Sequence, residues 1–163
     1  RDIRKFGKMR IINQAQYNEK FNASYDPLNK SYDIKKHLMY LDKKIKKGKS
    51  ICSIMMDQKF FPGVGNYIKS ETLYYSKIHP EEKWENLDTK KKTKLMENTK
   101  KVMNNSYISG GAELKDFKNP FYSSNFIPQI YGKKITKNNN VIISKKTSDS
   151  RTTWFCPEIQ KLI

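Results

Sequence analysis

The sequence is poor in cysteine, in long apolar segments and in arginine. Its 163 residues include two cysteines, Cys52 and Cys156, too few for a framework of disulfide bonds. No apolar run is long enough to span a bilayer, and no secretory signal peptide is recognisable. These absences predict an intracellular protein, located in the nucleus, the cytoplasm or a site of viral replication.

Positive charge is the strongest compositional feature of the chain. The formal net charge is +17 and the isoelectric point is near 9.8, which predicts a polyanionic partner: nucleic acid first, an acidic membrane surface second. Only four of the 33 basic residues are arginines, namely Arg1, Arg4, Arg10 and Arg151. A genome rich in A·T pairs explains the excess of lysine equally well, but not the net sign of the charge.

Hydrophobic periodicity predicts a helical region up to Gly110. Apolar residues recur at helical spacing from Ile34 to Ile45, and Gly48 is a suitable C-terminal stop. The predicted elements are a strand at 4–13, a loop at 22–29, and helices at 34–45, at 51–57, from 66 to before the His79-Pro80 pair, and from near 88.

The character of the sequence changes after Gly110-Gly111. Aromatic residues and prolines become frequent, and short runs rich in β-branched or aromatic side chains predict strands rather than helices. The expected strands lie at 129–131, 141–144 and 152–156, with an exposed turn at 138–140.

Four ordered blocks carry a resemblance to a known family. The blocks are Asp2-Ile3-Arg4-Lys5-Phe6-Gly7; Asp57-Gln58-Lys59 with Gly63-Val64-Gly65-Asn66-Tyr67 and Glu71; residues 110–117; and Arg151-Thr152-Thr153-Trp154-Phe155-Cys156. In this order they resemble the formamidopyrimidine-DNA glycosylase / endonuclease VIII family of base-excision repair enzymes, over the whole chain.

The resemblance implies a mainly α fold with a small β part. A helix-two-turn-helix subdomain at 30–124 would be followed by a zincless β-hairpin finger at 125–163. Residues 1–29 would be the end of an N-terminal catalytic domain and its linker. Because the chain starts with Arg1 rather than Met, it is expected to be a fragment or a processed piece of a longer protein.

Three residues are predicted to bind DNA phosphates: Lys59, Asn66 and Arg151. Asn66 opens a helix after a glycine turn, where free N–H groups and an amide favour a phosphate, and Lys59 adds a charge. Arg151 stands at the head of a strand, at the tip of a hairpin, where its guanidinium can form a fork with a phosphate. The alternatives are a helix cap for Asn66 and ordinary surface positions for the two cations.

The resemblance assigns further contacts to residues nearer the damaged base. It implies that Arg4 and Phe6 enter the minor groove and fill the space left by a flipped-out base, although Phe6 also suits the core of a strand. Lys115, Phe121 and Tyr122 belong to the expected lesion loop. This loop is somewhat shorter than the one that covers oxidised guanine in bacterial relatives, which favours oxidised pyrimidines.

Zinc is not expected, and no other cofactor is. Many members of this family hold the hairpin with four cysteines, whereas here Cys156 keeps one position and Ile159 stands where its partner would be. The upstream cysteine pair is missing too, and tetrahedral zinc needs four such ligands. Packing of the hairpin would replace the metal, with Trp154, Phe155, Val141 and Ile143 as the predicted contacts.

The family reaction needs an N-terminal proline amine followed by a glutamate, and this chain does not begin with that pair. No catalytic residue is therefore assigned within it, and alone it is expected to be inactive. The expected partner is double-stranded DNA with an oxidised base or an abasic site, bound by a monomer without membrane or metal. A catalytically inactive binder of damaged DNA is the main alternative, and an RNA-binding helix-two-turn-helix protein is a weaker one.

Overall fold

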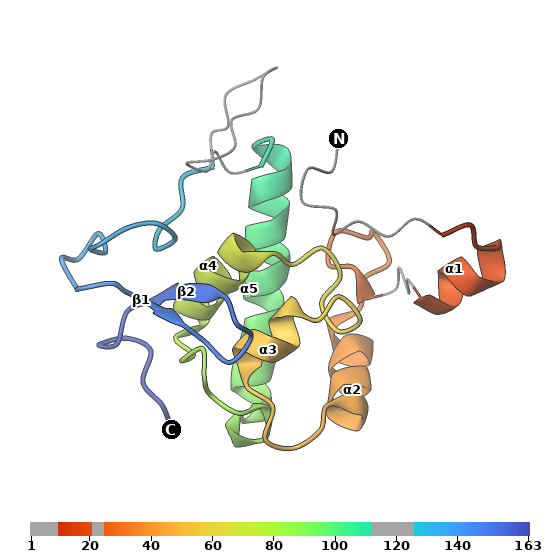
Figure 1. Ribbon diagram of the computed structural model, residues 1–163, viewed down its shortest axis with the longest axis horizontal. Coiled ribbons are helices and arrows are strands. Elements are labelled where there is room, and N and C mark those ends of the chain that lie inside the picture. The colour runs from red at the N-terminus through yellow and green to blue at the C-terminus, as the bar shows by residue number, and fades with distance from the viewer. Residues whose placement is uncertain (1–9, 21–24, 112–125) are drawn as a thin grey trace.

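The computed structural model describes residues 10–20, 25–111 and 126–163 (Figure 1). Within these segments the fold is mainly helical with one small antiparallel sheet, as the sequence predicts. The elements are α1 (Gln14–Lys20), α2 (Ile34–Lys44), α3 (Ile51–Met56), α4 (Asn66–Ser76), the short 3-10 helix η2 (Trp84–Asn86), α5 (Thr89–Ile108), β1 (Ile143–Lys146) and β2 (Thr152–Phe155). None of these helices is both long enough and apolar enough to cross a membrane.

The predicted helices begin where the sequence offers N-cap residues. The Asp33 carboxylate accepts from the backbone of Lys35 and Lys36 at the start of α2, and Asp88 accepts from Lys91 at the start of α5. The Ser50 hydroxyl caps α3 in the same way. Because these side chains satisfy N–H groups that have no partner inside the helix, they fix the starts of α2, α3 and α5.

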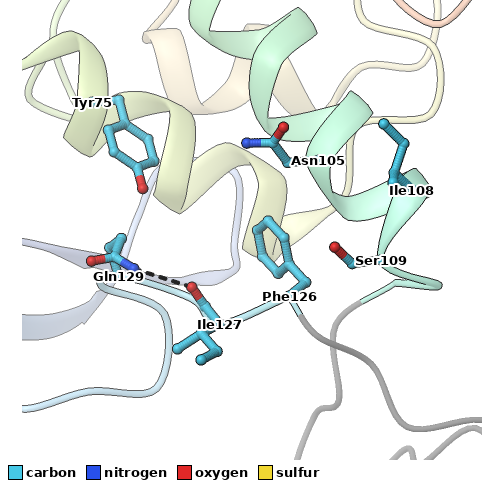
Figure 2. A pocket seen from close by; sticks show the side chains of 7 residues that line it. All are labelled: Tyr75, Asn105, Ile108, Ser109, Phe126, Ile127 and Gln129. Carbon is cyan, nitrogen blue, oxygen red and sulfur yellow. Dashed lines mark hydrogen bonds between the residues drawn. The ribbon is translucent and has the colours of Figure 1, made fainter.

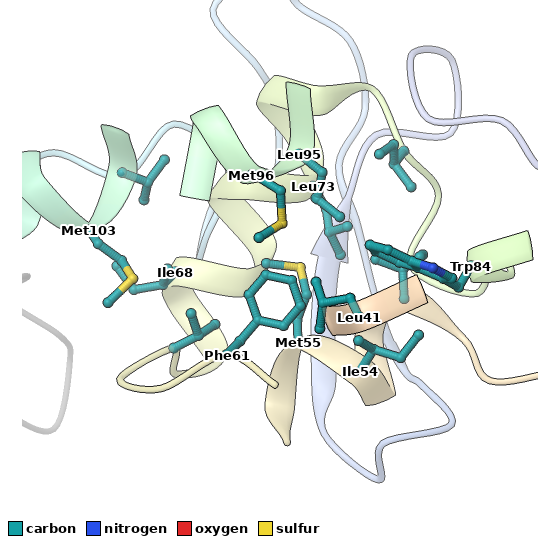
Figure 3. Close-up of a cluster of buried hydrophobic side chains, with 14 of the residues drawn as sticks. Leu41, Ile54, Met55, Phe61, Ile68, Leu73, Trp84, Leu95, Met96 and Met103 are labelled. Carbon is teal, nitrogen blue, oxygen red and sulfur yellow. The ribbon is translucent and has the colours of Figure 1, made fainter. Parts of the chain in front are cut away.

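One continuous hydrophobic core joins α2, α3, α4 and α5 (Figure 3). Leu41, Ile54, Phe61, Leu73 and Leu95 are fully buried in it. Figure 1 shows α4 and α5 side by side as the centre of the molecule, with α2 and α3 beside them. This core fixes the angle between α3 and α4, and so positions the glycine turn that connects them.

Helix α1 was not predicted from the sequence. Asn13 Oδ1 accepts from the Gln16 N–H at 2.9 Å, and Gln16 Oε1 accepts from the Asn13 N–H at 3.1 Å. This is a reciprocal capping box, and its sequence signature is an N-cap residue followed three positions later by glutamine. Of the strand predicted at 4–13, only residues 10–13 lie in the described part, and they form no strand.

The β-hairpin forms, but its packing differs from the prediction. β1 and β2 are antiparallel, with Ile143 opposite Phe155 and Lys146 opposite Thr152. Phe155 is buried, as expected, and Trp154 is half-buried, whereas Val141 is 58% exposed and Ile143 is 37% exposed. Since neighbouring residues of an extended chain point to opposite faces, Ile142 takes the inward position. It packs with Ile130 and Cys156 in a second, smaller core.

Residues 129–131 are not the strand that the sequence predicts. Their three N–H groups point at one carboxylate: Glu71 Oε2 accepts from Gln129 at 2.8 Å, and Oε1 accepts from Ile130 and Tyr131 at 2.9 Å each. A backbone turned around a single side chain cannot also pair with a neighbouring strand. Glu71 is 1% exposed and faces inward from α4, the orientation that the sequence predicts. It joins the helical region to the segment that precedes the hairpin.

Candidate nucleic-acid interface

The connection between α3 and α4 is held in one shape by Gln58. Its Nε2 donates to the Val64 carbonyl at 2.9 Å, and its Oε1 accepts from the Gly63 N–H at 3.0 Å. Gly63 has φ +77°, and a Cβ there would lie 3.1 Å from Met103 Cε. This position therefore requires glycine, for its backbone angle and for the space around it.

The start of α4 differs from the starts of α2, α3 and α5. Its N-cap is Gly65, which has no side chain to accept from the first turn. The N–H groups of that turn, together with the positive end of the helix dipole, therefore remain available to an anion. Lys59 is exposed in the turn that follows α3.

Asn66 joins the start of α4 to the hairpin. Its Nδ2 donates to the Thr152 carbonyl at 2.8 Å, although the two residues are 86 positions apart in the chain. The amide does not cap the helix, so that structural alternative is excluded. An amide NH₂ has two donor hydrogens, and one of them remains for a further acceptor. Arg151, next to Thr152, is exposed, so two of the predicted phosphate ligands belong to one connected unit.

The turn from Thr147 to Arg151 sets the position of the arginine. The Thr147 N–H donates to the Arg151 carbonyl at 3.0 Å, and Ser150 has φ +62°. Asp149 lies inside this turn, where its Oδ1 accepts from Thr147 Oγ1 at 2.5 Å and from the Arg151 N–H at 3.3 Å. The exposed Lys145 and Lys146 of β1 add positive charge close to the turn.

A buried ion pair beneath the turn was not found from the sequence. Lys69 of α4 contacts Asp149 with 2.5 Å between Nζ and Oδ2, and their side chains are 0% and 3% exposed. Burial acts to raise the pKa of Asp149, but hydrogen bonds from Lys69 and Thr147 and the charge of Lys69 outweigh it and lower that pKa. Nothing in the local sequence distinguishes Lys69 from the other lysines, because its partner is distant in the chain.

The helical region and the hairpin are similar to those of known proteins. Residues 24–118 match the family model described as the formamidopyrimidine-DNA glycosylase H2TH domain. The chain belongs to this family. The formamidopyrimidine-DNA glycosylase of Rickettsia bellii (strain OSU 85-389) is 31% identical over 169 residues, which cover 98% of this chain and 60% of the relative. The chain thus spans about 60% of the length of the curated relatives it matches.

Two solved structures of DNA glycosylases share the fold. A viral DNA glycosylase superposes with a TM-score of 0.74 at 29% identity, covering 90% of this chain and 53% of that one. A Lactococcus lactis FPG mutant in complex with DNA containing Fapy-dG superposes with a TM-score of 0.80 at 25% identity, covering 98% and 60%. The second similarity covers enough of the chain to include the helical region and the hairpin together.

The surroundings of Cys156 do not suit the zinc site that many family members have in this hairpin. Cys156 is fully buried, and its neighbours are the apolar Ile130, Ile142 and Ile159. In the part of the chain that the structure describes, no three His, Cys, Asp or Glu side chains are placed to hold a metal ion. Gln160 instead connects the hairpin to the helical region, since it accepts from the Cys156 N–H at 2.9 Å and donates to the Ile78 carbonyl at 2.8 Å.

The remaining predicted site residues lie outside the described residues. Arg4 and Phe6 precede residue 10, and Lys115, Phe121 and Tyr122 lie between 111 and 126, so their roles stay predictions. A hollow of about 380 Å³ lies beside Phe126 (Figure 2). Its lining is uncharged: Tyr75, Asn105, Ile108, Ser109, Phe126, Ile127 and Gln129. Such an uncharged surface does not suit a phosphate.

Proposed function

We propose that this chain grips the DNA backbone in a DNA glycosylase/AP lyase that removes oxidised bases and nicks the strand by β,δ-elimination. The observation that carries the proposal is the hydrogen bond from Asn66 to the Thr152 carbonyl, which places the uncapped start of α4 beside the turn that holds the exposed Arg151. Donors on two elements would then bind the phosphates of one damaged strand. The related FPG mutant bound to DNA containing Fapy-dG supports damaged DNA as the partner.

The chemistry requires an amine that attacks C1′ of the damaged nucleotide and a carboxylate that transfers protons. We place this pair in the part of the family's length that the chain does not span. The amine forms a Schiff base as the damaged base leaves, and elimination then breaks the strand on both sides of the sugar. The residues described above would hold the strand while this proceeds, and they would not themselves react.

Borohydride trapping of the full-length protein tests the enzymatic part of the proposal. Borohydride reduces a Schiff base to a stable amine, so a covalent protein–DNA product is expected with abasic duplex DNA. Thymine glycol duplexes should yield more trapped product than 8-oxoguanine duplexes, because the short segment between Phe117 and Tyr131 favours oxidised pyrimidines. A protein that binds the abasic duplex without trapping would instead be an inactive binder of damaged DNA, and a preference for 8-oxoguanine would overturn the choice of lesion.

Two substitutions test the phosphate grip. Asn66→Ala and Arg151→Ala should each weaken binding of the full-length protein to an abasic-site duplex by about tenfold, the equivalent of one good charge-assisted contact. Arg151→Ala should also reduce the slope of log affinity against log salt by about 0.9, whereas the neutral Asn66→Ala should leave that slope unchanged. Arg151→Lys is the matched control, since it keeps the charge but loses the fork, and should restore the slope without the full affinity. Unchanged binding in both alanine variants would remove these residues from the interface.

A further inference from the structure

The ion pair between Lys69 and Asp149 connects the two halves of the candidate interface. Lys69 lies three residues after Asn66 on α4, and Asp149 lies two residues before Arg151 in the hairpin turn. With 2.5 Å between Nζ and Oδ2 and with both side chains buried, the pair fixes the separation of these elements. Lys69 is too deeply buried to contact a phosphate itself. Its charge is paired with Asp149 inside the protein, whereas the exposed lysines can contact a phosphate.

Asp149 also determines the shape of the turn. One carboxylate oxygen binds Lys69, while the other accepts from the Thr147 hydroxyl and from the Arg151 N–H. The Thr147 hydroxyl in turn lies 3.0 Å from the Arg151 carbonyl and 2.6 Å from Thr153 Oγ1. The Arg151 N–H is therefore held by Asp149, and its carbonyl accepts from the N–H of Thr147, whose hydroxyl donates to Asp149.

Ser148 attaches the same turn to the helical region on another side. Its N–H donates to Glu81 Oε1 at 2.7 Å, and its hydroxyl lies 2.5 Å from Ser50 Oγ and 3.1 Å from Ser53 Oγ at the start of α3. These contacts restrain the tip of the hairpin. They leave Lys69–Asp149 as the charged contact between the turn and the helix that starts at Asn66.

We propose that Lys69 and Asp149 are positioning residues that set Arg151 relative to Asn66 for binding DNA phosphates. The proposal rests on the phosphate grip proposed above. A buried ion pair contributes little net stability compared with apolar residues of similar volume, so its value here lies in geometry. Its polar contacts fix the turn in a region where family members with zinc would use coordination bonds.

The direction in which Asp149→Asn changes the affinity for DNA distinguishes this positioning role from an effect of net charge alone. Asp149→Asn makes the protein more positive, so the overall charge alone predicts tighter binding to DNA. We expect instead that affinity for a duplex with a tetrahydrofuran abasic-site analogue falls by about tenfold in the full-length protein. Asp42→Asn is the matched control: it makes the same change of charge and breaks the partly exposed ion pair with Lys92, remote from the hairpin in sequence. It should not weaken binding.

A double-mutant comparison with Arg151 distinguishes the positioning role from a general loss of stability. A residue that only stabilises the fold would not change the effect of Arg151→Ala on affinity. If Asp149 acts through Arg151, then Arg151→Ala should cost at least threefold less affinity in the Asp149→Asn background than in the parent. Binding is measured well below the melting temperature of every variant, so that loss of folded protein does not contribute. Additive effects would overturn the proposal.

A charge-neutral double variant covers the case in which Asp149→Asn fails to fold. Lys69→Met with Asp149→Leu replaces the ion pair by apolar side chains and should melt close to the parent. Because the contacts from Asp149 to Thr147 and Arg151 are lost, its affinity should still be about tenfold lower. Parental affinity in this variant would overturn the positioning role. If Asn66→Ala and Arg151→Ala also leave binding unchanged, the phosphate grip fails as well; if those two weaken binding, only the role of the ion pair fails.

Discussion

Replacing Glu71 by alanine is expected to lower the free energy of unfolding by about 4 kcal/mol, because hydrogen bonds to a charged group contribute roughly 1.5–3 kcal/mol each. The carboxylate accepts from the N–H groups of Gln129, Ile130 and Tyr131, all within 2.9 Å. Alanine would leave these donors unpaired, with little access for water near Ile130, which is fully buried. Removing the cost of burying the carboxylate offsets part of the loss, which keeps the expected value below the simple sum.

Two further variants distinguish the loss of these hydrogen bonds from the general effect of replacing a glutamate. Glu71→Gln keeps one carbonyl oxygen but turns an NH₂ group toward the backbone donors, so it should lose about half as much stability. Glu97→Ala makes the same chemical change at an exposed position of α5 and should stay within about 0.5 kcal/mol of the parent. Denaturant unfolding measures all three. A loss below about 1 kcal/mol in Glu71→Ala would show that the segment before the hairpin finds other acceptors.

Loss of Glu71 should also be visible in the hairpin itself. Tyr131 packs against Trp154 of β2, with 4.3 Å between ring centroids, so releasing residues 129–131 changes the surroundings of that indole. The fluorescence of Trp154, read in a Trp84→Phe background, reports on the hairpin alone because the chain has two tryptophans. A shift of its emission in Glu71→Ala below the main unfolding transition would show that the carboxylate holds the hairpin region to α4.

The sequence predicted those parts of the fold that depend on local signals. The helices that became α2 to α5 were located from apolar periodicity and from the glycine turn before Asn66. The hairpin was located too, but the sequence did not show which residue of the run 141–143 is buried. Val141, Ile142 and Ile143 are all apolar, so alternation cannot show which of them points inward. The bond from the Ile142 N–H to the Lys134 carbonyl, at 2.8 Å, fixes this register and is not visible in the sequence.

Long-range polar contacts account for most of what the sequence did not reveal at the candidate site. Asn66 was predicted because a glycine turn and a family block mark it, and Arg151 because it heads a block; both stay predictions. Lys69 and Asp149 carry no such mark: a lysine among many and an aspartate in a Ser-Asp-Ser turn both suggest exposed surface. Only the packing of α4 against the hairpin reveals them as a buried pair. The sequence shows that these residues are a lysine and an aspartate, but their role depends on the contact between them, which only the structure shows.

A second large effect is expected from His37, a buried histidine that holds the turn after α3. Its Nε2 donates to the Phe60 carbonyl at 2.7 Å, so this nitrogen carries the hydrogen. In the neutral ring Nδ1 then accepts from the Tyr32 hydroxyl at 3.0 Å. The ring of Tyr25 stacks on the imidazole at 4.9 Å. Burial lowers the pKa of His37 to about 4, although the bond to the Phe60 carbonyl acts to raise it.

The lowered pKa makes folding dependent on pH in a stated direction. In the unfolded chain the histidine has a pKa near 6.5, so between about pH 6.5 and pH 4 the unfolded state binds more protons than the folded state. The stability contributed by the neutral ring is therefore complete above pH 6.5 and is lost as the pH falls toward 4. The shift amounts to about 3 kcal/mol at 1.36 kcal/mol per unit.

Unfolding in denaturant at pH 7.5, 5.5 and 4.5 measures this loss. His37→Gln removes the titrating group while it keeps a donor that can reach the Phe60 carbonyl. Its free energy of unfolding should be lower at pH 7.5 and should change less with pH than that of the parent. The other histidine, His79, also has a pKa lowered by burial, against the raising effect of Glu81 and Glu82, and it packs on Phe155 rather than on this turn. The free energy of unfolding of His79→Gln should therefore keep the part of its pH dependence that His37 causes. Equal pH dependence in His37→Gln and the parent would show that other groups cause the acid loss, and that the turn bearing Lys59 does not depend on a neutral His37.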